Sequence, residues 1–194
     1  MKSVLRSLLK SLFGGLFLAL TAPMALLSGF GRWEAPFVFF AQCLSLIPGL
    51  PGDYLRVGYY RLTLESFSPS ARIQFGSFFG HTQVIVAARV YIGSYCELGR
   101  VALGERTHVA SGVQIPSGRH QHGRNALGQL EGAEHGEFSR IRIGPDCWIG
   151  AGAIVMADLG AEVTIGAGAV VTKAMPDGVT AVGVPARPLP PQPL

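Results

Sequence analysis

The chain has 194 residues, a net charge of +4, only 14% charged residues and a positive mean hydropathy of +0.35. These values exclude an intrinsically disordered chain, which needs more charge and fewer apolar residues. The basic residues form no stripe interleaved with aromatics, so we expect no nucleic-acid partner. The three cysteines, Cys43, Cys96 and Cys147, form no CxxC pair, which indicates a reducing compartment and buried thiols.

Two uncharged runs, residues 12–31 and 35–52, occupy the first third of the chain. The first run has about the length that crosses a bilayer, and the second is slightly short. We expect residues 1–62 to form an apolar helical segment that associates with membrane lipid. The prolines in both runs favour a shallow hairpin as much as two full spans. A signal peptide, a buried core helix and an amphipathic surface helix are the alternatives.

The charges around these runs predict an orientation. Lys2, Arg6 and Lys10 precede the first run and place the N-terminus in the cytoplasm by the positive-inside rule. A hairpin returns the chain to the same side, so we expect the C-terminal domain at the cytoplasmic face of the inner membrane. The residues expected at the membrane–water interface are Arg56, Tyr59, Tyr60 and Arg61.

From about Ile73 onward the sequence advances in steps of six residues. Each step has an aliphatic residue, a small residue and then turn-like residues, as in Ile143-Gly144 and Ile149-Gly150. This period is typical of β-solenoids, in which three short strands form one coil and the aliphatic side chains point to the axis. We predict a mainly β chain with a parallel β-helix over residues 63–194, with glycine relieving strain at the corners. A β-sandwich is the alternative.

The period slips at two places, which predicts two shortened corners: Leu98 to Leu103 and Val155 to Leu159.

The segment IRIGPDCWIGAGAIVMADLGAEVTIGAGAVVTKAMPDGVTAVGVPARPL carries the elements WIG, VVTK and GVPAR. It resembles the C-terminal half of the hexapeptide-repeat acetyltransferases, which include the maltose, galactoside and nodulation-type sugar acetyltransferases. The resemblance covers roughly residues 90–190. It implies a left-handed β-helix, acetyl-CoA as co-substrate, and a homotrimer with active sites at the subunit interfaces. The N-terminal third lies outside the resemblance.

A polar excursion at about residues 117–140 interrupts the repeat, and long loops of this kind are usually functional. In the sugar acetyltransferases the catalytic histidine opens a comparable loop, and His120 falls on its place, with His122 as the alternate. Histidine suits a general base that deprotonates an acceptor hydroxyl near neutral pH. The family's second catalytic residue is an asparagine or acid, but Val90 and Leu98 stand at the aligned positions. Acids that could orient the imidazole are Glu97, Glu131, Glu134 and Glu137.

The resemblance also implies residues that bind the acetyl-CoA. Trp148 resembles the tryptophan beside the family's active-site tunnel. Small residues are expected to present backbone to the pantetheine arm, because they permit close approach; they are Gly150, Ala151, Ala169 and Thr172. Two cations, Lys173 and Arg187, are expected to meet the nucleotide phosphates. Cys96 and Cys147 stand at small-residue positions of the repeat, so we interpret both as packing residues and expect no acyl-enzyme.

Together these features predict an acetyl-CoA-dependent O-acetyltransferase. A hydrophobic segment would suit a lipid-linked acceptor, so we expect a saccharide or lipid-linked glycan from envelope or exopolysaccharide synthesis. One alternative is a zinc hydratase of the γ-carbonic-anhydrase type, for which His81, His108, His120 and His122 offer ligands. Another is a non-catalytic solenoid that scaffolds membrane enzymes.

Overall fold

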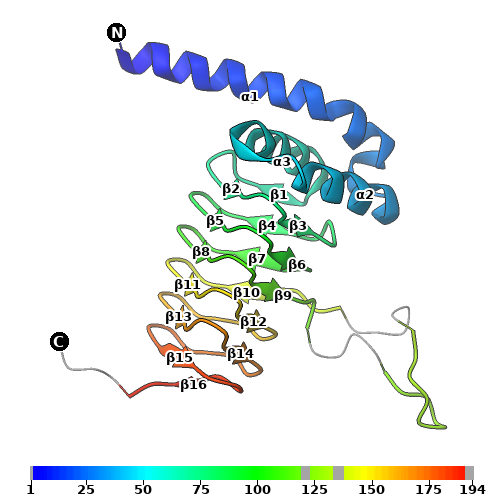
Figure 1. The fold of residues 1–194 in the computed structure, drawn as a ribbon, viewed down its shortest axis with the longest axis vertical. Helices are drawn as coiled ribbons and strands as arrows, with labels where there is room; N and C mark the ends of the chain where they lie inside the picture. Colours follow the sequence, from blue (N-terminus) through cyan, green and yellow to red (C-terminus); the bar gives the residue numbers. More distant parts are fainter. Residues whose placement is uncertain (1, 119–122, 133–137, 191–194) are drawn as a thin grey trace.

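The computed structural model describes the backbone of residues 2–118, 123–132 and 138–190, and the side chains from residue 14 onward within these ranges. Three helices lie at one end of a stack of short β-strands (Figure 1). Helix α1 lies across the end of the stack, and α3 lies between α1 and the first coil. The helices are α1 (Lys2–Leu27), a 3-10 turn η1 (Gly29–Gly31), α2 (Glu34–Ser45) and α3 (Gly49–Thr63).

The coils of the stack contribute their strands in turn to three sheets of parallel strands, which we name A, B and C. Sheet A contains β1 (Ser66–Phe67), β4 (Ile85–Val86), β7 (Val101–Leu103) and β10 (Ile141–Ile143). Sheet B contains β2 (Arg72–Ile73), β5 (Tyr91–Ile92), β8 (His108–Val109), β11 (Trp148–Ile149), β13 (Thr164–Ile165), β15 (Thr180–Val182) and the antiparallel β16 (Arg187–Pro188). Sheet C contains β3 (Phe78–Phe79), β6 (Glu97–Leu98), β9 (Gln114–Ile115), β12 (Ile154–Val155) and β14 (Val170–Val171). The predicted parallel β-helix is confirmed.

The interior of the β-helix is a column of aliphatic side chains, one from each strand. From sheet A to B and from B to C these residues are six apart, as in Phe67, Ile73 and Phe79. The steps from sheet C back to A are seven, five, 28, four and four residues, ending at Val86, Leu103, Ile143, Leu159 and Met175. Both predicted slips are therefore confirmed. Every irregularity of the period falls at the C–A corner, and the long loop leaves the solenoid there.

The glycine that follows the inward aliphatic residue is needed for coil stacking. A Cβ on Gly104 would lie 2.4 Å from the carbonyl carbon of Gly144 in the next coil. A Cβ on Gly144 would in turn lie 2.4 Å from the carbonyl oxygen of Gly160. A side chain at these positions would push neighbouring coils apart and lengthen the hydrogen bonds between their strands.

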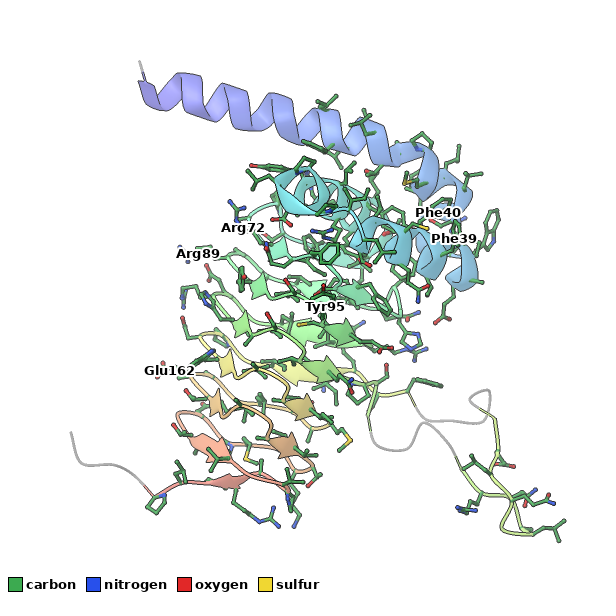
Figure 2. The ribbon with its side chains drawn as sticks, viewed as in Figure 1. Phe39, Phe40, Arg72, Arg89, Tyr95 and Glu162 are labelled. Carbon is green, nitrogen blue, oxygen red and sulfur yellow. The ribbon has the colours of Figure 1, made fainter. Side chains whose placement is uncertain are left out.

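Glycine occupies most left-handed turn positions at the B–C corner but few at the A–B corner; the exceptions are Tyr95 and Gly178. Gly112 and Gly152 take positive φ at the B–C corner, as expected. At the A–B corner, however, Arg89 and Glu162 take φ near 60° despite their side chains, and both project from the solenoid surface (Figure 2). The cost of such a conformation is about 1–2 kcal/mol per residue, so stacking rather than intrinsic preference holds these turns.

Helix α3 closes the first coil through a buried arginine. The Arg56 side chain is fully buried; its Nε donates to Ile73 O at 2.9 Å, and its Nη1 donates to Leu44 O and Ile47 O, each at 2.9 Å. Its Nη2 pairs with Asp53 Oδ1 at 2.6 Å. One guanidinium thus joins the end of α2, the start of α3 and the solenoid.

Two tyrosines complete this closure. Tyr59 and Tyr60 are fully buried, and the Tyr60 ring lies 5.0 Å from the ring of Phe79 and 5.7 Å from that of Phe67. Burial raises the pKa of Tyr59 to about 12 and also raises the pKa of Tyr60. The expectation that Arg56, Tyr59 and Tyr60 lie at a membrane interface is wrong, because they seal the open end of the β-helix core.

The two apolar runs fold as α1 and α2, which pack against α3 through Ala25, Phe37, Ala41 and Leu44. We expected the first run to enter a bilayer as one arm of a hairpin. Within the described residues, no helix combines the length and the apolar character that crossing a membrane requires.

We predict that Gly104→Ala lowers the free energy of unfolding by about 1–3 kcal/mol, the usual cost of overpacking. The matched control is Gly15→Ala, because a Cβ on Gly15 meets nothing within 4 Å and alanine favours helix by about 1 kcal/mol. Thermal unfolding followed by circular dichroism measures both. Equal melting temperatures for the two variants would contradict the proposed role of the glycine column.

Candidate functional site

The long loop has a closed neck at the C–A corner, between β9 and β10. Ser139 N donates to Ser117 O at 3.0 Å, which joins the two ends of the loop. Gly118 turns the chain outward with φ +91°, and a Cβ there would lie 2.3 Å from Ser139 Oγ. The neck is fixed by the solenoid even though the loop beyond it leaves the stack (Figure 1).

Phe138 anchors the returning end of the loop. Its carbonyl accepts a hydrogen bond from Arg100 Nη1 at 3.0 Å, and the Arg100 guanidinium lies 5.4 Å from its ring centroid. The His81 ring lies 5.3 Å from the Phe138 ring, edge to face. Residues of the first, second and third coils therefore hold the loop at one place.

The two candidate bases, His120 and His122, and the acids Glu134 and Glu137 lie outside the described residues. The described part of the loop, residues 123–132, is folded on itself around Asn125, whose Oδ1 accepts from the amides of Leu127 and Gln129 at 3.0 Å each. Glu131 N donates to Gly123 O at 2.9 Å. The remaining candidate acid, Glu97, lies on the outer face of sheet C.

A hollow of about 240 Å³ opens beside the neck on the side of the helices. We call it the histidine hollow; its lining includes His81, Glu97, Gln114, Ser117 and Phe138. Glu97 and Gln114 are register partners on β6 and β9, so their side chains project side by side from sheet C. The structure thus brings Glu97 to the root of the predicted active-site loop, although its role in orienting an imidazole stays a prediction.

Helix α2 contributes to this hollow through Glu34, whose Oε1 lies 2.5 Å from His81 Nδ1. The pair is an ion pair only when the imidazole is protonated. His81 is mostly shielded and Glu34 mostly exposed, with side-chain exposures of 19% and 59%. The helical end of the molecule therefore reaches the candidate site directly.

A second hollow, of about 500 Å³, lies on the other side of the neck. We call it the basic hollow; its lining includes Arg140, Arg142, Asp158, Thr172 and Lys173. Asp158 accepts from the Arg142 amide at 2.8 Å, and Arg140 pairs with Glu65. Lys173 forms no ion pair with any described residue. Cations around a cavity of this size suit an anionic ligand. The residues that line the basic hollow include two that are predicted to bind acetyl-CoA, Thr172 and Lys173.

Two other predicted ligands lie on a different face. Trp148 on β11 is 59% exposed on the outer side of sheet B, and Arg187 on β16 is exposed at the end of the same sheet. In a three-sided coil, sheet B faces away from the C–A corner. One chain therefore does not bring Trp148 and Arg187 together with Thr172 and Lys173.

Two small residues predicted to contact pantetheine are already used inside the solenoid. Gly150 is buried, its N donates to Ile165 O at 2.7 Å and its O accepts from Ala153 N at 3.2 Å. Ala169 is 1% exposed and its O accepts from Ile154 N at 2.8 Å. Within this chain neither residue exposes surface, and their contact with pantetheine stays a prediction. Ala151 is exposed at the B–C corner and stays a candidate.

Cys96 and Cys147 are buried free thiols, and burial is the main cause that raises the pKa of each. Their sulfurs lie close to the carbonyls of the next coil: Cys96 Sγ is 3.1 Å from Ala110 O, and Cys147 Sγ is 3.0 Å from Gly160 O. Both are thus packing residues, as predicted. Cys43 on α2 is exposed, contrary to the expectation that all three thiols are buried.

The histidines weighed as zinc ligands do not converge in the described part of the chain. His81 lies at the C–A corner, and His108 lies on the outer face of sheet B, where its ring is 5.9 Å from that of Tyr91. Among the residues that the structure describes, no three histidine, cysteine, aspartate or glutamate side chains are grouped to hold a metal ion.

Comparison with known proteins identifies the repeat and the fold. Residues 140–173 match the family described as hexapeptide repeat of succinyl-transferase. A search of curated protein sequences found no match. Among solved structures, a hexapeptide-repeat acetyltransferase from Vibrio cholerae superposes with a TM-score of 0.67 at 14% identity, over 81% of this chain and 89% of the other.

Two further structures share the fold. A maltose O-acetyltransferase from Clostridium difficile gives a TM-score of 0.64 at 22% identity, over 80% of this chain and 84% of the other. The N-acyltransferase AntD from Bacillus cereus, in complex with dTDP and 3-hydroxybutyryl-CoA, gives 0.53 at 17% identity, over 61% of this chain and 68% of the other. These likenesses show that the chain has the hexapeptide-repeat β-helix fold.

Sequence reasoning missed part of both hollows. Arg140 and Arg142 flank the inward Ile141 where the period resumes, and this basic alternation was a usable signal. The sequence suggested His81 only as a zinc ligand. Its contact with Glu34 could not be predicted, because the two residues lie in distant segments that no sequence pattern links.

We predict that a thiol reagent such as DTNB modifies one cysteine, Cys43, in the native protein at pH 8. Cys96 and Cys147 should react only after unfolding, since both are buried and their raised pKa disfavours the reactive thiolate. The absorbance of released thionitrobenzoate measures the reaction, and Cys43→Ser serves as the control. A second thiol that reacts rapidly in the native state would contradict this assignment.

Proposed function

We propose that the protein is an acyl-CoA-dependent O-acyltransferase that uses acetyl-CoA and a saccharide hydroxyl as substrates. The observation that carries this proposal is the position of the loop neck. The loop that bears His120 and His122 leaves the solenoid between the basic hollow and the histidine hollow. A donor with phosphates on one side and a polar acceptor on the other would meet at this loop. Similarity in fold to acyltransferases supports the same class of reaction.

In the proposed reaction His120 acts as the general base. Its imidazole removes the proton of the acceptor hydroxyl as the oxygen attacks the thioester carbonyl. The tetrahedral intermediate collapses with cleavage of the carbon–sulfur bond, and the imidazolium protonates the departing CoA thiolate. Glu97, at the root of the loop, is the described acid placed to orient the imidazole; His122 is the alternative base.

The basic hollow supports the proposed acetyl-CoA site. Its guanidinium and ammonium groups, from Arg140, Arg142 and Lys173, match phosphate oxygens. Lys173 is exposed and forms no described ion pair, so its charge is available to a ligand. Thr172 lies beside it and would contact the pantetheine arm.

The histidine hollow supports a hydroxylated acceptor. Gln114, Glu97 and His81 offer hydrogen-bond donors and acceptors around a cavity of about 240 Å³. We propose a saccharide or a lipid-linked glycan of envelope or exopolysaccharide synthesis, modified at the cytoplasmic face of the inner membrane.

The positions of the predicted donor ligands support a homotrimer. Trp148 and Arg187 lie on sheet B, opposite the corner that bears Lys173 and the loop neck. Around a three-fold axis, the C–A corner of one subunit can face sheet B of the next, so each groove combines residues from two chains. Ala151, at the end of sheet B's strand β11, would then line the groove of the neighbouring subunit.

We predict that His120→Ala lowers turnover by about two to four orders of magnitude, the usual contribution of a general base. Release of CoA from acetyl-CoA, measured with a thiol reagent in the Cys43→Ser background, follows the reaction. The acceptor panel should include neutral sugars, an amino sugar and lipid-linked saccharides. Acetyl-CoA affinity, measured by calorimetry, should be unchanged, because the lost group acts on the acceptor proton.

His122→Ala is the matched control and should retain most of the activity. Near-normal turnover in His120→Ala would contradict the assignment, and loss confined to His122→Ala would move the role of base to that residue. Transfer only to the amino sugar would replace O-acylation by N-acylation.

We predict that subunits carrying His120→Ala and subunits carrying Trp148→Ala complement each other. Each homotrimer should be nearly inactive, whereas each mixed trimer should recover about a third of its sites, since any 2:1 ring contains one groove in which both chains supply the intact residue. Co-expression with two affinity tags allows mixed trimers to be isolated and assayed.

Recovery requires that the two residues act from different chains. Mixed trimers that form but remain inactive would place the whole site within one subunit. A monomer with full activity in size-exclusion chromatography with light scattering would contradict the trimer altogether.

A further inference from the structure

The outer surface of the helices carries most of the exposed apolar side chains. Of eighteen large hydrophobic residues that are exposed among the described side chains, ten lie between Leu16 and Tyr54. We call this surface the apolar cap. Its members include Leu26 and Leu27 in α1, Trp33 before α2 and Phe39 within α2, which are each 60–63% exposed. Figure 2 shows Phe39 at the outer edge of α2. Exposed apolar surface of this kind marks an interaction site.

The apolar cap is almost free of charge. Arg32 and Glu34 are the only charged residues between residues 11 and 47. Glu34 is already paired with His81 at the histidine hollow. The partner of this surface must therefore be apolar over a wide area.

The sequence of the helical part of the chain has an excess of basic residues. Residues 1–63 contain six basic residues against two acidic ones, whereas residues 64–194 contain ten of each. The helices thus account for the whole net charge of +4. Both acidic residues of the helices are paired, Asp53 with Arg56 and Glu34 with His81. The excess includes Lys2, Arg6 and Lys10, which precede the apolar run of α1.

We propose that the apolar cap docks in the plane of an anionic lipid bilayer without crossing it. Exposed leucine, tryptophan and phenylalanine would enter the boundary between headgroups and acyl chains, and the neighbouring basic residues would attract anionic headgroups. No described helix can span a membrane, which favours docking over insertion. A second copy of this chain is a poorer occupant, because two surfaces that each carry the positive charge of the protein repel each other.

The position of the apolar cap determines how the proposed acceptor site would lie relative to the membrane surface. Helix α1 runs across the end of the stack of coils (Figure 1). With α1 in the membrane plane, the stack points away from the bilayer. At roughly 4.8 Å per coil, the loop neck lies about 10 Å farther from the bilayer than the first coil does. The histidine hollow lies between the neck and the helices, on the side nearer the lipid. This consequence rests on the proposed function, whereas the docking itself does not.

Trp33 provides a direct test, because the chain has only two tryptophans, Trp33 and Trp148. In full-length Trp148→Phe protein, all tryptophan fluorescence comes from Trp33. We expect a blue shift on addition of vesicles of phosphatidylcholine and phosphatidylglycerol in about a 7:3 ratio, and a much weaker effect with phosphatidylcholine alone. Lipids brominated near the headgroup should quench Trp33 more than lipids brominated near the end of the acyl chain.

In flotation assays, a triple variant with Leu26→Gln, Leu27→Gln and Phe39→Gln should bind the mixed vesicles with an affinity at least about tenfold lower than the parent's. The matched control, Leu127→Gln, Leu130→Gln and Leu189→Gln, removes exposed hydrophobics outside the helices and should bind like the parent. Both should keep the parent's melting temperature, since the changed side chains are exposed. These binding assays need no acyl transfer, so they separate failure of docking from failure of the proposed activity.

Four outcomes would overturn the proposal. They are no binding of the parent to either vesicle, equal binding by the triple variant, stronger quenching from the end of the acyl chain, and loss of a larger oligomer in the triple variant. The last outcome would identify a second copy of the chain as the occupant of the apolar cap.

Discussion

Stacking of coils at the distance of parallel strands is the constraint on which this molecule depends. Adjacent strands lie about 4.8 Å apart, so the inward side chain of each strand must stand directly over that of the next. The contact of Gly104 with Gly144, and of Gly144 with Gly160, leaves no room for a side chain at these positions. The same constraint holds Arg89 and Glu162 in left-handed turns that their side chains disfavour.

The solenoid concentrates variation at a single corner. The steps from sheet A to B and from B to C keep six residues in every coil, while the step from C to A varies from four residues to 28. The number of residues between a strand of sheet C and the next strand of sheet A can change, because that strand starts the next coil. The long loop, the histidine hollow and the basic hollow all lie at this corner. Changes of length and of polarity are thus confined to the place where they do not disturb the core.

The helices close the end of the core and also reach the candidate site. Arg56, held by carbonyls of α2 and of the first coil, is fully buried and paired with Asp53. Loss of its partner would leave an uncompensated buried charge, which is strongly destabilising. The same helices place Glu34 against His81. Their inner surface is therefore part of the solenoid domain, and their outer surface carries exposed apolar side chains.

The sequence by itself determined the β-helix, its coil boundaries and its long loop, because each depends on a local period. Ile143, Ile149 and Val155 are six residues apart, and a period of six with small residues at the turns satisfies only one architecture. The short steps that end at Leu103 and Leu159 were predictable from the sequence for the same reason. The packing roles of Cys96 and Cys147 also followed from their place in the repeat.

Only the tertiary structure decided what lies beside what. Composition makes Arg56, Tyr59 and Tyr60 look like interfacial residues, yet they are buried, because the open end of a solenoid must be covered by something apolar. Gly150 and Ala169 are small residues of the repeat, and neighbouring coils cover both of them within the chain. Trp148 and Lys173 belong to the same segment of resemblance but lie on opposite sides of the three-sided solenoid. A local pattern specifies which face a residue takes within its strand, whereas the packing of distant segments decides whether that face meets solvent, ligand or another part of the chain.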